Sequence, residues 1–236
     1  MMYADRMKCR IENKYIVSES ELKALEKRLS PIMQADIHQD GDCYEIRSLY
    51  FDDLDNRCMD ENEAGVDVRK KYRIRIYGPD AEKAKLEIKE KLNNKTRKSI
   101  CEITRSEAEQ LMQGEFPLLL GSRAPLNLLQ INMKCLHMEP KIVITYERTA
   151  FVYPEGNVRI TFDRNITASR VKEDLYAQNQ AIAIPVLPTG MHILEVKYDE
   201  FLPQFIARQI DTGDLLQTSF SKYYLGRLAS QGIFPV

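Results

Sequence analysis

The sequence lacks the patterns that identify several classes of protein. No stretch approaches the roughly 18 consecutive apolar residues that span a bilayer, and the start, MMYADRMKCR, has no apolar core of a secretory signal. Phosphate loops of the GxxxxGK[ST] or GxGxxG type are absent, and so are linker-like or low-complexity stretches. The sequence therefore predicts one domain over residues 1–236, with no membrane span of its own.

Cysteine and histidine motifs are also missing. The five cysteines are scattered, and none forms a CxxC pair or a Cys/His cluster, which disfavours both zinc and a disulfide framework. A reduced cytoplasmic protein is the favoured interpretation. The three histidines, His38, His137 and His192, fall in no catalytic pattern, and we expect His192 to be structural.

The sequence has no overall excess of positive or negative charge. The 236 residues carry a formal net charge of −1, with 44% apolar and 29% charged residues, as in an ordinary globular protein. Any basic site must therefore be a local concentration that acidic residues elsewhere offset. This balance argues against a general nucleic-acid binder, and we expect no nucleic-acid partner.

The apolar pattern indicates mostly strands, with a few helices. Strands are expected at residues 8–17, 44–53, 70–78, 84–91, 96–103, 141–153, 158–166 and 191–199. Helices are expected between Ser18 and Pro31 and over residues 105–113, 125–137, 201–208 and 219–230. A meander, helices and a second meander suit an antiparallel, barrel-like α+β fold better than a parallel βαβ sheet.

Charged residues recur at every second position in strand after strand. In KKYRIRIYG, residues 70–78, Arg73 and Arg75 alternate with Ile74 and Ile76. The same alternation occurs at Arg10/Glu12/Lys14, Glu87/Lys89, Tyr146/Arg148, Arg159/Thr161/Asp163 and Glu195/Lys197. For any single strand, a solvent-exposed polar face is the simplest explanation.

The composition of these faces favours an anion-binding interior instead. Arginine suits bidentate recognition of phosphate, whereas an exposed edge needs only any charge. Nine basic residues against three acidic ones leave a local excess of six positive charges. This excess fits a triphosphate or a longer anion, because ATP carries about four negative charges. The basic residues are Arg10, Lys14, Arg73, Arg75, Lys89, Arg148, Arg159, Lys197 and Lys222.

The three acidic residues on these faces have two interpretations. They can neutralise neighbouring cations, or they can hold Mg²⁺ or Mn²⁺, which take oxygen ligands and bridge phosphates. Glu195 is the first candidate for a metal ligand, while Glu12 and Glu87 could instead orient arginines. Tyr50 and Tyr146 could donate hydrogen bonds from these faces, but we expect them to be buried core tyrosines.

Eight motifs together resemble a known family. RIENKY, SLYFDD, YRIRIYG, KLEIKEK, YERTAF, VRITFD, LEVKY and SFSKYYLG resemble, in that order, the motifs of the VTC domain. This is the polyphosphate polymerase domain of the vacuolar transporter chaperone family, within the triphosphate tunnel metalloenzyme, or CYTH-like, superfamily. The resemblance runs from about residue 8 to residue 228. Each motif is weak alone, but eight in order are specific.

The resemblance implies a closed eight-stranded antiparallel β-barrel, the triphosphate tunnel, with helices packed outside. It implies a metal-dependent polymerase, using Mn²⁺ or Mg²⁺, that transfers the γ-phosphate of ATP to inorganic polyphosphate. Carried over, the catalytic residues are Arg73, Arg75, Lys89, Arg148 and Arg159. The substrate-binding residues are Lys14, Lys98, Lys197, Ser221, Lys222 and Arg10, with Arg97 as an alternative to Lys98. The metal ligands are Glu195, Glu12 and Glu87.

Some features depart from the pattern of the family and its superfamily. The ExExK strand of the superfamily reads Arg10-x-Glu12-x-Lys14 here, so the first acid is missing, as in the polymerase branch. We expect the phosphate-sensing and membrane domains of the eukaryotic proteins to be absent. We expect a monomer that binds ATP and polyphosphate, with a membrane protein as a candidate partner.

Two other functions use the same residues. A metal-dependent triphosphatase would hydrolyse an inorganic or organic triphosphate with water as the nucleophile. A non-catalytic module would bind polyphosphate or another polyanion. RNA binding is disfavoured, because the aromatic and glycine platforms of RNA modules are missing.

Overall fold

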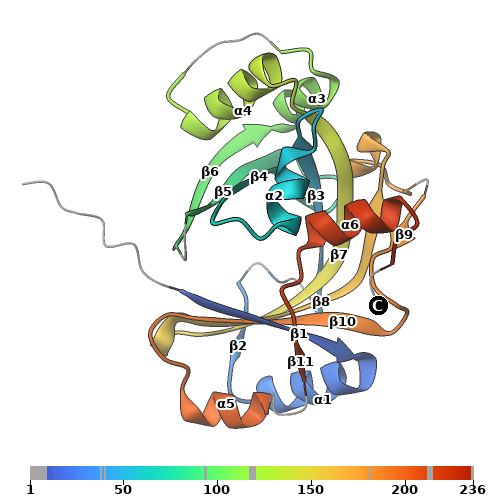
Figure 1. The fold of residues 1–236 in the computed structure, drawn as a ribbon. Coiled ribbons are helices and arrows are strands. Elements are labelled where there is room, and N and C mark those ends of the chain that lie inside the picture. Colours follow the sequence, from blue (N-terminus) through green and yellow to red (C-terminus); the bar gives the residue numbers. More distant parts are fainter. Residues whose placement is uncertain are drawn as a thin grey trace, which may run out of the picture. The chain divides into compact units, whose positions relative to one another are not determined.

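The structure is a computed structural model that describes residues 10–37, 39, 41–92, 95–116, 121–180, 182–211 and 215–234 (Figure 1). The chain forms two compact units. Unit 1 comprises Met1–Tyr44, Glu147–Asn165 and Pro188–Phe220, and unit 2 comprises Glu45–Tyr146, Ile166–Leu187 and Ser221–Val236. The long strands β7 (Glu139–Tyr153) and β8 (Val158–Ser169) contribute to both. The expectation of one domain stays a prediction.

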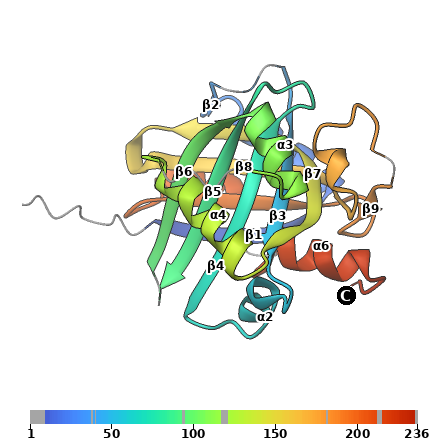
Figure 2. The same ribbon diagram turned by 90° about the horizontal axis from the view of Figure 1, so that it is seen from above.

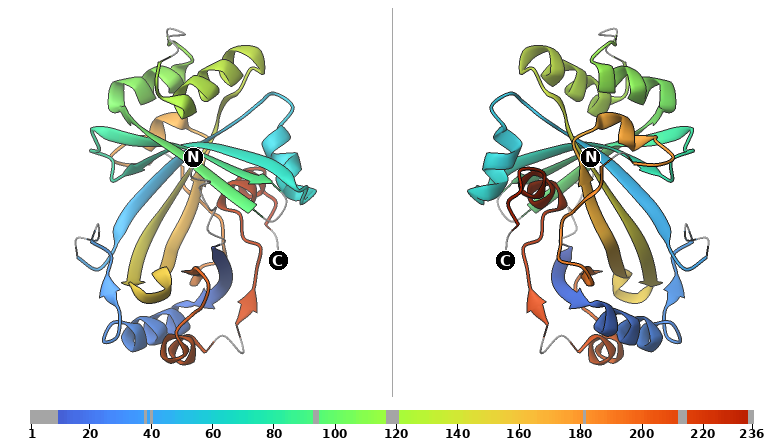
Figure 3. Two further views of the ribbon diagram at one scale, coloured as in Figure 1. Left: turned by 90° about the vertical axis from the view of Figure 1, so that its left-hand side faces the viewer. Right: turned by 90° about the vertical axis from the view of Figure 1, so that its right-hand side faces the viewer.

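Unit 1 is a sheet with two helices on one face. Its further strands are β1 (Ile11–Ser18), β2 (Gln34–Ala35), β10 (Met191–Tyr198) and β11 (Leu216–Gln217). Its helices are α1 (Glu19–Leu29), α5 (Gln204–Ile210) and the 3-10 turn η1 (Glu155–Asn157). Figure 3 shows α1 and α5 side by side, and the two helices contact each other.

A capping box and an apolar stripe explain helix α1. The Ser18 hydroxyl accepts a hydrogen bond from the Glu21 backbone N–H, and the Glu21 carboxylate accepts one from the Ser18 backbone N–H. Leu22, Leu25 and Leu29, spaced three and four residues apart, are all buried. They pack on the sheet residues Tyr15, Val17, Phe151, Val158, Ile160, Phe162, Leu194 and Val196. The expected helix and its cap are confirmed.

Unit 2 is a sheet covered by helices. Its strands are β3 (Tyr44–Asp52), β4 (Val68–Tyr77), β5 (Lys83–Leu92), β6 (Lys95–Thr104) and β9 (Ile184–Pro185). Its helices are α2 (Arg57–Glu63), α3 (Arg105–Gln113), α4 (Ala124–Cys135), α6 (Lys222–Ser230) and the 3-10 turn η2 (Lys172–Leu175). Figure 2 shows α3 and α4 over one face of β4, β5 and β6, and both helices contact β5 and β6.

The face that these helices cover is apolar. Ile74, Ile76, Leu86 and Ile88 are almost completely buried. Arg73 and Arg75 alternate with Ile74 and Ile76 along the strand. Since alternate residues of a strand point to opposite sides, the two arginines lie on the other face. Within unit 2, this confirms that the apolar positions of KKYRIRIYG face the helices.

Helix α6 approaches its sheet closely at one residue. A Cβ atom on Gly226 would lie 2.3 Å from Ile144 Cδ1 of β7 and 3.5 Å from Ala168 Cβ of β8. A larger residue at this position would force the end of the Ile144 side chain to move.

The strands form one antiparallel order, but it is not a closed barrel. The order is β11-β1-β10-β8-β7-β3-β4-β5-β6, with β2 paired to β7 and β9 to β8. In the described ranges, eleven strands are present, of which eight have eight residues or more. The prediction of a closed eight-stranded barrel is therefore wrong in its closure. The two end strands of this order are β11 and β6. Strand β11 has only two residues, and β6 leads directly into helix α3 through the N-cap residue Thr104.

Helix α2 was not expected. It begins at Arg57, a few residues after β3 ends at Asp52. The carboxylates of Asp52 and Asp53 accept hydrogen bonds from the backbone N–H groups of Arg57, Cys58 and Met59. Among the helices in the described part of the chain, none is long and apolar enough to cross a membrane. The compartment and the oligomeric state stay predictions.

Candidate functional site

In unit 2, charged residues of neighbouring strands lie on one face of the sheet. Antiparallel pairing places Arg73 opposite Tyr50 of β3 and also opposite Glu87 of β5. Arg75 is two positions further along β4, opposite Ser48. Because of the strand alternation, these side chains lie opposite the apolar face that α3 and α4 cover.

Glu87 is the centre of the ionic contacts on this face. Its Oε2 accepts a hydrogen bond from Arg73 Nε at 2.7 Å, and its Oε1 accepts one from Lys98 Nζ at 2.8 Å. Arg75 Nη1 lies 3.8 Å from Oε2. Burial alone would raise the pKa of Glu87, but the three cations outweigh it and hold this pKa well below its usual range. The buried carboxylate therefore stays charged and aligns three cations.

The same two arginines also donate hydrogen bonds to two tyrosine hydroxyls. Arg73 Nη1 donates to Tyr50 Oη at 3.0 Å, and Arg75 Nη2 donates to Tyr146 Oη at 3.2 Å. Arg75 Nε also donates to Ser48 Oγ at 3.3 Å. Both tyrosines are buried core residues, as expected, and their hydroxyls also accept hydrogen bonds from the arginines of the charged face.

The contacts of strand β6 show which of Lys98 and Arg97 lies on the charged face. Lys98 bonds to Glu87 and so lies on the face of the arginines. Arg97 is opposite Glu90, and its Nε lies 3.9 Å from Glu90 Oε2. Adjacent residues of a strand point to opposite sides, so Arg97 lies on the other face.

Lys89 is the middle of a row of three lysines. It is opposite Lys71 of β4 and opposite Lys98 of β6. Like charges opposite one another destabilise a sheet, so an anion at this row would be stabilising. Burial and the neighbouring arginines lower the pKa of Lys98 to about 8, although Glu87 opposes the shift.

Ser221 and Lys222 stand at the start of α6. Ser221 Oγ accepts a hydrogen bond from the Tyr224 backbone N–H as the N-cap, and another from Lys71 Nζ at 2.8 Å. Lys222 Nζ lies 4.9 Å from the centroid of the Tyr146 ring. Both predicted residues are thus in contact with side chains of the charged strands.

Sequence reasoning missed the buried network that holds this end of α6. Tyr223 Oη donates to Asp52 Oδ2 at 2.5 Å, and Arg227 Nη1 donates to Tyr223 Oη at 2.9 Å. Asp52 is fully buried and also caps α2. Burial and Asp52 raise the pKa of Tyr223, so its hydroxyl stays a donor. The available signal was the pair of motifs SLYFDD and SKYYLG, which supply Asp52 and Tyr223.

In unit 1, pairing of β1, β10 and β8 brings other predicted residues into two cross-strand rows. Lys14 is opposite Glu195, and Glu195 is opposite Thr161. The second row, in the same strand order, is Glu12, Lys197 and Arg159. Since residues two apart on a strand share a face, both rows lie on one side of the sheet.

Two lysines bridge the two glutamates of these rows. Lys14 Nζ lies 3.3 Å from Glu12 Oε1 and 3.7 Å from Glu195 Oε1. Lys197 Nζ lies 3.8 Å from Glu12 Oε2 and 2.9 Å from Glu195 Oε2. Burial alone would lower the pKa of Lys14, but the carboxylates outweigh it and raise this pKa above its ordinary value. Lys14 therefore stays charged.

Arg148 and Arg159 each bond to a buried aspartate that sequence reasoning did not pair with them. Arg148 donates from Nε to Asp163 Oδ1 at 2.6 Å and from Nη2 to Asp163 Oδ2 at 2.8 Å. Arg159 Nη2 lies 2.9 Å from Asp36 Oδ2 and donates to Tyr44 Oη at 3.3 Å. Arg159 is part-exposed, whereas Arg148 is buried.

The structure does not bring Arg10 into these rows. Arg10 precedes β1, its Nη2 donates to the Asn157 backbone oxygen at 2.9 Å, and its Nε lies 3.9 Å from Asp199 Oδ1. Its side chain is 39% exposed. These contacts link the start of β1 to the turn before β8 and to the residue that follows β10.

The residues that fit a divalent cation are Glu12 and Glu195. Opposite Glu195, the Thr161 hydroxyl is buried without a hydrogen-bond partner among the described residues. Mg²⁺ commonly binds through one or two carboxylates together with substrate phosphates, which this oxygen-rich set matches. In the described ranges, no group of three His, Cys, Asp or Glu side chains could hold a metal alone. Glu87 fits less well, because three cations surround it, namely Arg73 and Lys98 at 2.7 and 2.8 Å and Arg75 at 3.8 Å. Glu12 and Glu195 are each contacted by two lysines.

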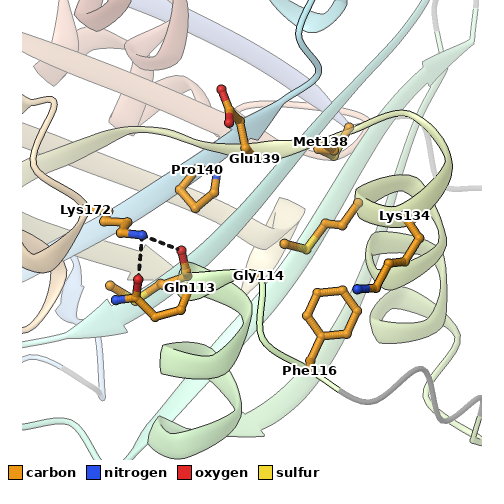
Figure 4. Close-up of a pocket in the computed structure, with 10 residues that line it drawn as sticks. Gln113, Gly114, Phe116, Lys134, Met138, Glu139, Pro140 and Lys172 are labelled. Carbon is orange, nitrogen blue, oxygen red and sulfur yellow. Dashed lines mark hydrogen bonds between the residues drawn. The ribbon is translucent and has the colours of Figure 1, made fainter.

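A separate pocket of about 260 Å³ lies in unit 2 (Figure 4). Lys172 Nζ donates there to the Met112 backbone oxygen at 3.0 Å and to Gln113 Oε1 at 2.7 Å. Lys134 Nζ lies 4.9 Å from the centroid of the Phe116 ring. The lining includes none of the predicted site residues.

Comparison with solved structures agrees with the fold. A candidate adenylate cyclase from Bacillus halodurans superposes with a TM-score of 0.55 and 14% identity, covering 91% of this chain and 94% of that protein. Proteins from Pyrococcus horikoshii (11% identity, 94% and 99% covered) and Pyrococcus furiosus (14%, 88% and 94%) each give a TM-score of 0.46. At 14% identity, the likeness to the Bacillus halodurans protein shows the fold alone.

Sequence comparison identifies the family. No curated protein matches the chain. The family model of the VTC domain matches residues 9–230, which include every charged residue described in both units. This confirms the resemblance that the eight motifs indicated. The chain therefore belongs to the VTC domain family.

Proposed function

We propose that this chain is a polyphosphate polymerase, which transfers the γ-phosphate of ATP to a growing polyphosphate chain in a metal-dependent reaction. Family membership supports a phosphate substrate. The observation that carries the proposal is the charged face of unit 2. There Arg73, Arg75 and Lys98 are aligned by the single buried carboxylate of Glu87.

The reaction needs no general base from the protein. A terminal oxygen of the acceptor polyphosphate attacks the γ-phosphorus and forms the new P–O bond. The bond from the γ-phosphorus to the β–γ bridging oxygen breaks, and ADP leaves with that electron pair. The attacking oxygen is already anionic, so catalysis consists of positioning and charge neutralisation.

The residues of unit 2 supply positioned cations. Arg73 and Arg75 are held by Glu87 and by tyrosine hydroxyls before any ligand arrives, so little reorganisation is needed when phosphate binds. Lys89 and Lys98 place two further charges on the same face. Ser221 and Lys222 at the start of α6 complete the proposed phosphate-binding set.

The residues of unit 1 supply the proposed cation site. Glu12 and Glu195 would hold Mg²⁺ or Mn²⁺, which when bound neutralises charge on the phosphate oxygens. Lys14, Lys197 and the part-exposed Arg159 would contact phosphate oxygens. Arg148 would position the face, since both its hydrogen bonds go to Asp163.

Hydrolysis is the second candidate function, because one metal-bound triphosphate can serve either reaction. The adenylate cyclase name belongs to the Bacillus halodurans protein and does not choose between reactions here. Gel analysis of chain length after incubation with ATP and Mn²⁺ separates the two. A ladder of polyphosphate supports the polymerase, whereas ADP and orthophosphate alone identify a triphosphatase.

A binding module without activity is tested by substitution of Glu195. Glu195→Gln removes the charge that the cation site needs, while it retains the shape of the side chain. We expect metal-dependent ATP turnover to disappear and binding of long-chain polyphosphate to remain. Absence of ATP turnover in the unsubstituted chain, with intact polyphosphate binding, would instead support a binding module.

A further inference from the structure

The Thr161 hydroxyl is an exception on the charged face of unit 1. Thr161 is 1% exposed, and its Oγ1 has no hydrogen-bond partner among the residues that the structure describes. Buried hydroxyls almost always have a partner, because burial without one forfeits the hydrogen bonds that water would supply. Such a group therefore indicates a bound ligand, ion or ordered water.

The position of Thr161 is defined by strand register. It is opposite Glu195 of β10, and Glu195 is in turn opposite Lys14 of β1. Directly opposed residues of an antiparallel pair have Cβ atoms about 4.5–5.5 Å apart. Thr161 is thus the direct cross-strand neighbour of Glu195, in the row that contains one of the two proposed cation ligands.

The charged side chains around Thr161 bond to one another. Arg159, two residues before it, pairs with Asp36, and Asp163, two residues after it, accepts both hydrogen bonds of Arg148. The two glutamates of the rows are bridged by lysines. The Thr161 hydroxyl is therefore a neutral oxygen among ion pairs, and no described side chain bonds to it.

We propose that the Thr161 hydroxyl is a further oxygen donor, beside Glu195, for the divalent cation of this face. The inference rests on the proposed function, which places a cation at Glu12 and Glu195. Hard cations such as Mg²⁺ and Mn²⁺ accept neutral oxygen ligands as well as carboxylates. A neutral donor adds no negative charge that would repel a bound triphosphate, which a third carboxylate would do.

Thr161→Val tests this assignment, since valine keeps the branched shape and lacks only the hydroxyl. Mn²⁺ binding to the full chain is measured by electron paramagnetic resonance without nucleotide, beside Thr161→Ser and Glu195→Gln. We expect Thr161→Val to weaken Mn²⁺ binding about tenfold or more, as loss of groups around metal sites does. Thr161→Ser should bind within about twofold of the unsubstituted chain.

Thermal unfolding without metal separates this role from a structural one. A hydroxyl that has no partner contributes nothing to the metal-free fold, so the unfolding midpoint of Thr161→Val should not fall. A lower midpoint with unchanged Mn²⁺ affinity would overturn the inference and make the hydroxyl structural.

Glu195→Gln distinguishes failure of the inference from failure of the proposed cation site. Loss of Mn²⁺ binding in Glu195→Gln, with unchanged binding in Thr161→Val, overturns the Thr161 assignment and leaves the cation site in place. Unchanged binding in Glu195→Gln removes the cation site itself, and the Thr161 assignment falls with it.

Discussion

Arg148 donates two parallel hydrogen bonds to Asp163, from Nε to Oδ1 at 2.6 Å and from Nη2 to Oδ2 at 2.8 Å. Asp163 is completely buried. Removal of one partner from a buried ion pair leaves an uncompensated charge, which costs about 3–5 kcal/mol. We therefore expect Arg148→Ala to lower the free energy of unfolding by about 3 kcal/mol or more, as measured by urea denaturation.

A double variant is the control for this prediction. Arg148→Met together with Asp163→Asn removes both charges, so it should recover part of the stability lost in Arg148→Ala. Surface substitutions usually change the free energy of unfolding by less than about 0.5 kcal/mol. A change no larger than this in Arg148→Ala would show that the pair is not structural.

Arg75 and Arg97 form a matched pair on opposite faces of the unit 2 sheet. Arg75 bonds to Ser48 and Tyr146 on the charged face, while Arg97 is 73% exposed on the other. Loss of a preorganised donor to a reacting group lowers kcat by about 10²–10³-fold. We expect Arg75→Ala to lose ATP turnover to that extent and Arg97→Ala to keep it. Equal activities for the two variants in a coupled ADP-release assay would contradict the assignment.

The alternation of charged and apolar residues predicted much of both faces. A period of two fixes which residues share a side of a strand, so Arg73, Arg75 and Glu87 could be grouped from sequence alone. It does not fix the bond made by each side chain, because that depends on register and on distant segments. The pairing of Arg159 with Asp36 is an example, since the two residues are far apart in the chain.

The pH dependence of phosphate binding should depend on Lys98. Burial lowers its pKa to about 8, so Lys98 is protonated below that pH and loses its positive charge as the pH rises through it. The affinity for tripolyphosphate should therefore fall between about pH 7 and pH 9. Lys98→Arg is the control, because arginine stays charged throughout this pH range. The affinity of the Lys98→Arg protein for tripolyphosphate should therefore fall less. An identical fall in both proteins, measured by calorimetry, would exclude Lys98 as the cause.

Tyr223 and Tyr224 are neighbours with different surroundings. The Tyr223 hydroxyl donates to buried Asp52 and accepts from Arg227, whereas Tyr224 is only partly buried. Tyr223→Phe leaves Asp52 short of a donor, so it should cost about 1–3 kcal/mol of unfolding free energy. Tyr224→Phe should stay within about 0.5 kcal/mol. If chemical denaturation finds equal losses for the two, the buried network does not stabilise α6.

Two features of the fold were not predicted correctly from the sequence: the sheet is not closed into a barrel, and helix α2 was not expected. Both capping boxes were legible, because Ser18–Glu21 and Thr104–Glu107 are local signals. Helix α2 has no such box, and the carboxylates of Asp52 and Asp53 satisfy its first N–H groups instead. Closure depends on pairing between strands far apart in the chain, which no local pattern encodes.

The fate of the γ-phosphate of ATP tests the central claim most directly. Phosphorus NMR of the chain with ATP, Mg²⁺ and a tripolyphosphate primer follows ADP, orthophosphate and internal phosphate units in one sample. We predict that internal phosphate rises in step with ADP while orthophosphate stays low. A rise of orthophosphate equal to that of ADP, with no internal phosphate, would contradict the polymerase.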